Sequence, residues 1–302
     1  MASGRYLILG GSGYIGRHLY ARLGPRKALA TWYTHPFPGG FHFDSGNMRI
    51  ADLVRGQGSF SHAFILMGIS RLLECERDKA TSHRVNVINP QSVIDQLRAL
   101  RIKPVFASTD VVFDGLRGHY REEDPTHPLV TYGRQKLAVE RYMLTPGNNE
   151  GLVVRLAKVY GIRPGEGTLL SNWLEALTSG TEIRCADDQC FCPVFIDDVV
   201  NGLLALAEHD LTGLYHLCGP TCCSRRELLE MFLGAYVSRF GPVRDLKVTY
   251  RSINDFDFPE RWPLDTSMST EKLRLAIGWE PTPPEPLCQR FVAGLQEDVF
   301  GE

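Results

Sequence analysis

The chain has 302 residues, of which 43% are hydrophobic and 23% charged, and its formal net charge is −2. This length and composition allow one large α/β domain with a smaller second lobe, or two ordinary domains, and argue against disorder. The near-neutral charge argues against nucleic acid or a membrane surface as a partner, and the lack of an export signal or of an apolar run of about 18 residues predicts a cytoplasmic protein without a membrane span.

Short apolar runs alternate with helical patterns over the first half of the chain. In chain order we expect strands at 6–9, 27–33, 41–43, 62–67, 104–107 and 152–155, and helices at 18–23, 84–100 and 132–143. Val93, Leu97 and Leu100 share one side of the second helical pattern, and Pro90 is expected to kink or break it. Strands that alternate with helices predict an α/β protein with a doubly wound parallel sheet.

After about residue 161 the pattern is less regular. Helices are expected at 169–177 and 226–240, and proline-rich turns at 281–286 precede a last helix. We therefore predict a first domain over residues 1–160, whose sheet is completed by later segments, and a smaller C-terminal lobe over residues 161–302.

Seven of the eight cysteines lie at or beyond Cys185. Cys190 and Cys192 are separated by one residue, and Cys222 and Cys223 are adjacent. Zinc sites usually need four ligands with two to four residues between paired cysteines, so we expect no metal. We interpret these residues as reduced thiols.

A glycine-rich segment follows the first strand and opens a helix with the spacing G-x-x-G-x-x-G. Glycine permits a sharp turn and lets a pyrophosphate approach the helix N-terminus, where unbonded N–H groups and the helix dipole favour an anion. We therefore predict that residues 1–160 form a Rossmann domain that binds a dinucleotide. Its pyrophosphate loop is predicted to consist of Gly10, Ser12, Gly13, Tyr14, Ile15 and Gly16.

The end of the second strand selects between the two nicotinamide dinucleotides. An acidic side chain there would accept hydrogen bonds from the ribose and repel a 2′-phosphate. Residues 31–35 contain no acid, so we predict NADP(H) as the preferred cofactor and NAD(H) as the alternative, with Thr34 lining the site. Arg17 either reaches toward the phosphate or stays in solvent. Asp44 either accepts from the adenine amino group or caps a turn.

Tyr132 and Lys136 are four residues apart and share one helix face. Hydride transfer to a carbonyl leaves an alkoxide that needs a proton, and a nearby ammonium is expected to lower the pKa of a phenol toward working pH. Thr109 follows the fifth strand and can donate to the substrate oxygen, and Asn86 is expected to hold a water that feeds protons to the lysine. Each residue also has a structural interpretation, as a surface pair or a helix cap. Their joint occurrence after a glycine loop predicts catalysis by Thr109, Tyr132 and Lys136. Tyr132 and Lys136 are also expected to contact the cofactor, where the lysine can hold a ribose hydroxyl.

The chain resembles the extended short-chain dehydrogenase/reductases and, within them, the dTDP-4-dehydrorhamnose reductase group. The resemblance implies a reductase of a nucleotide-linked keto-deoxysugar, with Thr109, Tyr132 and Lys136 as catalytic residues and a nicotinamide over Met67, Gly68 and Ile69. Family members are often dimers, so the resemblance allows a homodimer but leaves the oligomeric state open. It is carried by residues 10–16, 75–76, 85–87, 108–115, 120–124, 132–136, 159–161, 261–263 and 267–273.

Three departures from the family pattern lie where the substrate should be recognised: Val111, residues 156–158 and residues 190–192. Val111 stands where a nucleotide-sugar dehydratase would carry glutamate, which disfavours dehydration. Candidate substrate contacts are Ser108, Asp110, Lys158, Cys192 and Arg261.

Two other functions stay open at this point. Residues 120–136 look about equally like the β subunit of methionine adenosyltransferase, which binds NADP and regulates a partner enzyme. A nucleotide-sugar epimerase would keep bound NAD and consume no cofactor.

Overall fold

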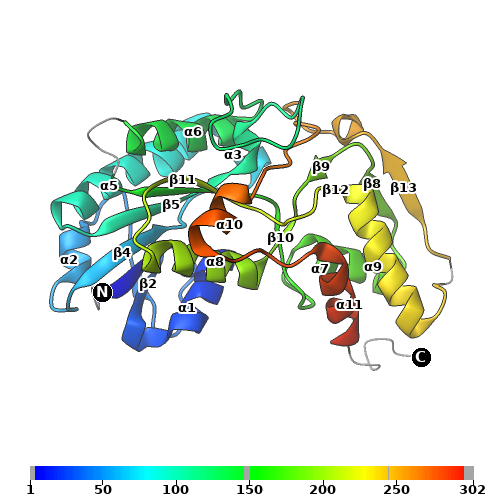
Figure 1. The fold of residues 1–302 in the computed structure, drawn as a ribbon, viewed down its shortest axis with the longest axis horizontal. Helices are drawn as coiled ribbons and strands as arrows, with labels where there is room; N and C mark the ends of the chain where they lie inside the picture. The colour runs from blue at the N-terminus through cyan, green and yellow to red at the C-terminus, as the bar shows by residue number, and fades with distance from the viewer. Residues whose placement is uncertain (1–3, 146–149, 244, 296–302) are drawn as a thin grey trace. The chain divides into compact units, whose positions relative to one another are not determined.

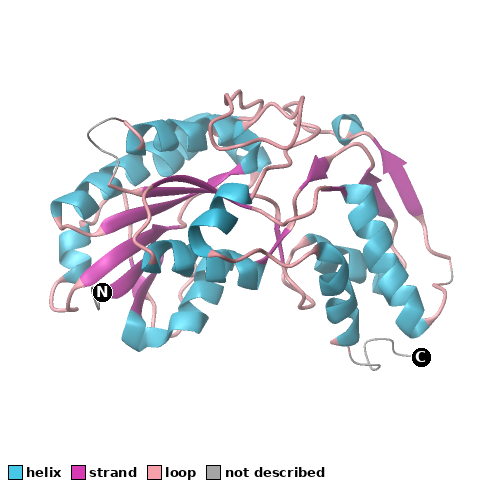
Figure 2. Ribbon diagram, in the orientation of Figure 1, coloured by secondary structure: helices cyan, strands magenta, loops and turns pink. Residues whose placement is uncertain are grey.

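A seven-stranded sheet forms the centre of the first of two units (Figures 1 and 2). The computed structural model describes residues 4–145, 150–243 and 245–295. The strand order is β11-β6-β5-β4-β1-β2-β3, and the registers that join β5, β4, β1, β2 and β3 are parallel. This is the order of a doubly wound Rossmann sheet, so the predicted fold class is confirmed. The strands are β1 (Arg5–Leu9), β2 (Ala28–Trp32), β3 (Phe41–His42), β4 (Phe60–Ile65), β5 (Lys103–Thr109), β6 (Leu152–Leu156) and β11 (Gly213–Leu217).

Helices cover both faces of this sheet. α1 packs against β1 and β2, and α5 and α6 pack against β5 on the opposite face (Figure 1). The helical segments are α1 (Tyr14–Lys27), α2 (Ile50–Val54), α3 (Leu72–Arg77), α4 (Lys79–His83), the π-helical turn η1 (Arg84–Ile88), α5 (Asn89–Ala99), the 3₁₀ turn η2 (Asp110–Val112), α6 (Thr131–Met143) and α8 (Ile196–Glu208).

The core between the sheet and its helices follows the apolar pattern of the sequence. Leu7, Ile8 and Leu9 of β1 are consecutive and all buried, as expected for a strand that is covered on both faces. Val93 and Leu97 of α5 are also fully buried. Leu100 is 39% exposed, so the prediction that it continues this stripe is wrong. α5 ends at Ala99, and the turn that follows takes Leu100 off the buried side.

The helix does not break at Pro90: the backbone stays helical on both sides, and the irregularity is a π-helical turn just before the proline. Residues Arg84–Ile88 form this turn, and Pro90 then lies at the start of α5. Proline has no N–H to donate, and the Asn89 N–H just before it bonds to the Arg84 carbonyl oxygen with π-helical spacing. π-helical turns occur often at functional sites, and this one carries the candidate residue Asn86.

The second unit consists of short two-stranded sheets and separate helices. Among its described residues, β10 pairs with β7, β12 with β9, and β13 with β8. The expected helices at 169–177 and 226–240 and the last helix are present. The short strands were not predicted, because they are too short to show an alternation of apolar and polar residues. The elements are β7 (Val159–Tyr160), α7 (Leu169–Ser179), β8 (Ile183–Ala186), β9 (Cys190–Phe191), β10 (Val194–Phe195), β12 (Cys223–Ser224), α9 (Arg225–Phe240), β13 (Val248–Arg251), the 3₁₀ turn η3 (Ile253–Asp255), α10 (Glu271–Ile277) and α11 (Pro284–Ala293).

The two units interleave along the chain. Unit 1 comprises Met1–Val112, Pro125–Arg155 and Val200–Tyr215, and unit 2 comprises Phe113–Asp124, Leu156–Val199 and His216–Glu302. The domain boundary expected near residue 160 stays a prediction. Within the described ranges, no helix is both long enough and apolar enough to cross a membrane.

Candidate functional site

The loop between β1 and α1 is shaped by close backbone contacts. Gly10 has φ +93°, and its N–H donates to Thr31 Oγ1 at 3.1 Å. A Cβ atom on Gly16 would lie 2.2 Å from the carbonyl oxygen of Gly10. α1 begins at Tyr14 without a side-chain cap at Gly13 and without an acidic residue in its first turn. Its N-terminal N–H groups and positive dipole end are therefore suited to an anion, and these residues fit the pyrophosphate of a dinucleotide.

The rest of the predicted loop lies at the same helix terminus. Ser12 and Ile15 are partly exposed. The Arg17 guanidinium lies 5.0 Å from the centroid of the Tyr14 ring. A Cβ on Gly10 would approach the Met67 backbone nitrogen to 2.7 Å, so the loop adjoins the end of β4. The structure thus brings the candidate pyrophosphate loop and the candidate nicotinamide segment together within unit 1.

The close approach at Gly16 predicts a large effect of a single methyl group. Gly16→Ala would place that methyl against backbone atoms of Gly10 and Gly11, at 2.2 and 2.8 Å, so the loop must move. We expect the unfolding free energy to fall by about 1–3 kcal/mol and dinucleotide affinity to fall at least about tenfold. Calorimetry and thermal unfolding measure the two effects. Gly234→Ala is the control, because nothing lies within 4 Å of its Cβ position, and wild-type affinity in Gly16→Ala would contradict the assignment of this loop.

Thr34 and Asp44 lie near the ends of β2 and β3. Thr34 is exposed, and its Oγ1 lies 2.8 Å from His35 Nδ1. Asp44 accepts hydrogen bonds from the Asn47 side chain at 2.8 Å and the Gly46 N–H at 2.9 Å, which lower the pKa of its carboxyl group. Asp44 therefore stabilises a turn, which agrees with the interpretation of this residue as a turn cap. Its contact with adenine stays a prediction.

Asn86 has partners that differ from those predicted. Its Oδ1 accepts from the Ile69 N–H at 2.8 Å, and its Nδ2 donates to the Ile69 carbonyl oxygen at 3.0 Å and to Gln135 Oε1 at 2.8 Å. Gly68 has φ +143°, and a Cβ there would lie 2.8 Å from Asn86 Oδ1. We expected Asn86 to hold a water for Lys136. The structure instead uses both ends of its amide to fix the turn after β4.

Three side chains line one face of α6 at four-residue intervals: Tyr132, Lys136 and Glu140. Lys136 Nζ donates to the Ala107 carbonyl oxygen at 2.7 Å. The same atom lies 4.5 Å from the centroid of the Phe106 ring and 5.7 Å from that of the Tyr132 ring. The predicted tyrosine–lysine pair is thus anchored against the end of β5.

Burial dominates the acid–base properties of this pair. It raises the pKa of Tyr132 well above its usual value, and the charges of Cys75 and Asp110 act in the same direction. It lowers the pKa of Lys136 to about 8, against the opposing effect of Glu140. The prediction that Lys136 brings the Tyr132 pKa down is therefore wrong, because desolvation of the phenolate outweighs the distant ammonium. Tyr132 stays protonated and is suited to donate a proton.

Thr109 ends β5 and Asp110 begins η2, beside the start of α6. The Thr109 hydroxyl donates to Asp110 Oδ1 at 3.1 Å, and both residues are buried. Gly133 permits this proximity, since a Cβ there would lie 2.2 Å from the Val111 carbonyl oxygen. To bind a substrate oxygen, the Thr109 hydroxyl would have to give up its hydrogen bond to Asp110.

Ser108 is directed away from the place we predicted for it. Its hydroxyl donates to Glu140, which forms a buried ion pair with Arg155 at 2.7 Å. Successive strand residues point to opposite faces of a sheet, so Ser108 and Thr109 cannot both line one site. The assignment of Ser108 as a substrate contact is therefore corrected to a structural role in the Glu140–Arg155 cluster.

Sequence reasoning missed Glu140, Gln135 and Arg155. Glu140 could have been found, because it follows Lys136 by four residues on the same helix. Gln135 donates to Ser82 at 2.8 Å and supports Asn86, and Arg155 lies on β6. The sequence spacing does not reveal that Gln135 contacts Asn86 or that Arg155 contacts Glu140.

The other candidate substrate residues belong to unit 2. Lys158 is exposed, and its carbonyl oxygen accepts from the Val194 N–H at 3.0 Å. Cys192 is buried and donates to the Met268 carbonyl oxygen at 3.5 Å, and Arg261 is exposed. None of the eight cysteines is in a disulfide, and no metal-binding group of three His, Cys, Asp or Glu occurs among the residues that the structure describes.

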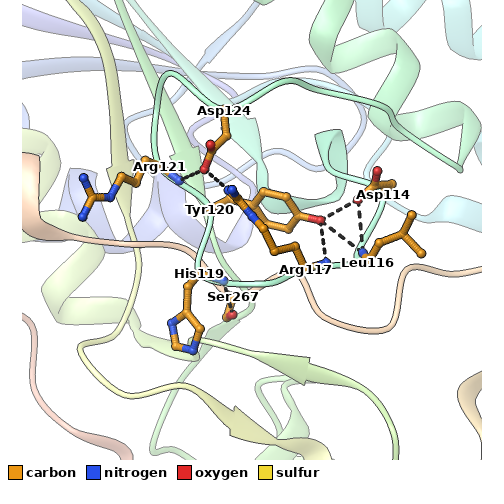
Figure 3. Close-up of polar contacts among 8 residues, drawn as sticks. All are labelled: Asp114, Leu116, Arg117, His119, Tyr120, Arg121, Asp124 and Ser267. Carbon is orange, nitrogen blue, oxygen red and sulfur yellow. Dashed lines mark hydrogen bonds and ion pairs between the residues drawn. The ribbon is translucent and has the colours of Figure 1, made fainter.

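Tyr120 organises the loop Phe113–Asp124 of unit 2 (Figure 3). Its ring stacks on Phe113 with 4.0 Å between centroids, and its hydroxyl donates to Asp114 Oδ1 at 2.5 Å and accepts from the Leu116 N–H at 3.1 Å. The His119 N–H donates to Ser267 Oγ at 2.8 Å. Two segments that carry the family resemblance, 120–124 and 267–273, are thereby joined.

Comparisons with known proteins agree with this architecture. The family model described as the RmlD substrate binding domain matches residues 4–296. The dTDP-4-dehydrorhamnose reductase of Streptomyces griseus is 29% identical over 256 residues, 80% of this chain and 80% of that protein. The dTDP-4-dehydrorhamnose reductase of Bacillus anthracis, solved in complex with NADP, has a TM-score of 0.80 at 21% identity over 97% of this chain and 100% of that chain. MoeE5, solved with UDP-glucuronic acid and NAD, has a TM-score of 0.76 at 22% identity over 95% and 98%. The chain therefore belongs to the RmlD substrate binding domain family.

Proposed function

We propose that this protein is an extended short-chain dehydrogenase/reductase that uses NADPH to reduce the keto group of a nucleotide-linked deoxysugar. The observation that carries the proposal is the presence in one unit of an anion-binding glycine loop and of Tyr132 and Lys136 on one face of α6. The names of the relatives, which include dTDP-4-dehydrorhamnose reductases, support this substrate class.

Proton delivery is the task of the chain's own residues. When bound, the reduced nicotinamide supplies the hydride for the sugar carbonyl carbon. Tyr132 gives its phenolic proton to the carbonyl oxygen, which is favourable because a phenol is a stronger acid than an alcohol, whose pKa is near the 15.7 of water. Lys136 Nζ lies 5.7 Å from the centroid of the tyrosine ring, where its positive charge offsets part of the cost of burying the phenolate that remains. Thr109 orients the same carbonyl oxygen by a hydrogen bond.

The cofactor preference is supported by the surface beyond β2. Residues 31–35 include no carboxylate that would repel a 2′-phosphate, and the exposed Thr34 and Arg17 lie at the two segments that flank this surface. NADP(H) is therefore the proposed cofactor, and NAD(H) is the alternative. Asp110, Lys158, Cys192 and Arg261 are proposed to contact the substrate. The homodimer and the cytoplasmic location stay predictions.

The pKa of Lys136 predicts how the reaction depends on pH. The folded protein loses this proton near pH 8, whereas the unfolded chain keeps it up to about 10.4. The ammonium is therefore present below pH 8 and is lost above it, while folding stability gains as pH rises through this interval. We expect kcat/KM, which reports on the free protein, to fall as pH rises through about 8. Lys136→Arg, which stays charged, should remove this decline, and a wild-type profile that is flat from pH 7 to 9.5 would contradict the role of the ammonium.

The proposed function is tested with purified full-length protein, NADPH and a panel of nucleotide-linked keto-deoxysugars that includes dTDP-4-dehydrorhamnose. We expect NADPH consumption with at least one of them. Tight NADPH binding without turnover, together with a co-purifying partner, would replace the proposal by a regulatory subunit. Conversion of a sugar without net NADPH consumption would replace it by an epimerase.

A further inference from the structure

Three cysteine thiols of unit 2 lie together although they are distant in sequence. Cys192 and Cys218 both donate to the Met268 carbonyl oxygen, at 3.5 and 3.2 Å. The Cys192 thiol also lies near enough to the thiols of Cys218 and Cys222 for both to affect its pKa. Cys192 follows β9 and Cys222 precedes β12, so two paired strands carry the cluster.

The strand register places Cys192 opposite Cys222. β9 and β12 are antiparallel, with Phe191 facing Cys223 and Cys190 facing Ser224. One step further along this register, residue 192 faces residue 222. Directly opposed residues of an antiparallel pair have Cα atoms about 4.5–5.5 Å apart, within the range of about 4.4–6.8 Å that a disulfide spans.

The two thiols also differ in access to solvent. Cys192 is only 3% exposed, whereas Cys222 is partly exposed. Both line a hollow of about 370 Å³ together with Arg121, Gly219, Thr270 and Arg274, all within unit 2. A small reagent can therefore reach Cys222 first, and Cys192 is the buried thiol next to it.

From this geometry we propose that Cys192 and Cys222 are a dithiol that low-molecular-weight disulfides oxidise to a cross-strand disulfide. The Cys222 thiolate attacks one sulfur of the reagent, forms a mixed disulfide and releases one thiolate. The Cys192 thiolate then attacks the Cys222 sulfur, forms the Cys192–Cys222 bond and releases the second thiolate. Two protein thiols are oxidised, one reagent disulfide is reduced to two thiols, and the two protons leave with these thiols.

Burial and mutual contact set the conditions of this reaction. The nearby Cys218 thiol raises the pKa of Cys192, and the nearby Cys192 thiol raises the pKa of Cys222, with burial adding to both. The thiolates are therefore scarce at neutral pH, so the reaction is run at mildly alkaline pH. Cys218 is the alternative disulfide partner for Cys192, since its thiol also lies next to the Cys192 thiol.

The test uses the reduced full-length protein and glutathione disulfide, followed by alkylation and peptide mapping. Residues 185–225 contain no lysine or arginine before Arg225, so trypsin leaves six cysteines in one peptide, and a further cleavage after Glu208 separates Cys192 from Cys222. We expect a disulfide between segments 185–208 and 209–225, with two glutathione molecules released per chain and none retained. A reductant should reverse it.

Four serine variants identify the pair. Cys222→Ser should leave Cys192 reduced, and Cys192→Ser, whose hydroxyl can still donate to Met268, should retain one glutathione on Cys222. Cys190→Ser and Cys218→Ser are the matched controls and should still form the disulfide. A bond that survives in Cys222→Ser, a stable glutathione adduct on the wild-type protein, or no reaction at all would overturn the proposal.

Discussion

Tyr132→Phe is expected to lower kcat by about 10²–10⁴-fold while dinucleotide affinity falls by no more than about tenfold. The substitution removes only the hydroxyl, which burial keeps protonated and which is the proposed proton donor. The glycine loop that would hold the pyrophosphate follows β1, which is separated from β5 by β4 in the sheet order, whereas Tyr132 lies on α6. Steady-state kinetics with NADPH and calorimetric titration measure the two quantities.

Tyr142→Phe is the matched control for this variant. Tyr142 lies on the same helix, and its hydroxyl donates to Asp95 Oδ1 at 2.5 Å, away from Lys136. Its loss should leave kcat within about twofold, since a hydrogen bond at a partly exposed site contributes only about 1 kcal/mol to stability. If Tyr132→Phe kept a comparable share of wild-type kcat, another group would have to deliver the proton.

Glu140→Ala is expected to lower the unfolding free energy by about 3–5 kcal/mol. The side chains of Arg155 and Glu140 are 4% and 1% exposed, and Arg155 contacts Glu140 at 2.7 Å through Nη2 and at 3.1 Å through Nε. Without the carboxylate, Arg155 keeps its charge in a place that water does not reach, and Ser108 loses its acceptor. Denaturant unfolding measures the effect.

The double variant Glu140→Ala with Arg155→Met separates a lost ion pair from a stranded charge. Because it removes both charges, it should recover much of the stability lost in the single variant. A single variant within about 1 kcal/mol of wild type would indicate that the pair is not buried as described. Glu140→Ala should also move the pH-dependent fall in kcat/KM to lower pH, because the carboxylate helps to keep Lys136 protonated.

Local patterns predicted the parts of the site that depend on one element. The spacing of Gly10, Gly13 and Gly16 specifies a turn and a helix start, and the four-residue interval between Tyr132 and Lys136 specifies one helix face. Apolar runs likewise predicted the central strands, since strands buried on both faces are continuously hydrophobic.

Properties that depend on partners from other elements were not predictable in the same way. Ser108 was misassigned because Glu140 and Arg155, which occupy its side of the sheet, come from α6 and β6. Asn86 was expected to hold water because nothing in its neighbourhood reveals that Gln135 and Ile69 use its amide. The pKa of Tyr132 depends on burial, which the sequence does not give.

The most direct measurement of the central claim is deuterium transfer from NADPH to the sugar. NADPH labelled at C4 of the nicotinamide, in separate samples for its two faces, is incubated with the protein and dTDP-4-dehydrorhamnose. One of the two samples should yield a sugar that carries deuterium at the former carbonyl carbon, in amounts equal to the NADP⁺ formed. If the protein bound NADPH but both samples kept their label on the nicotinamide, Tyr132 and Lys136 would not serve a hydride transfer.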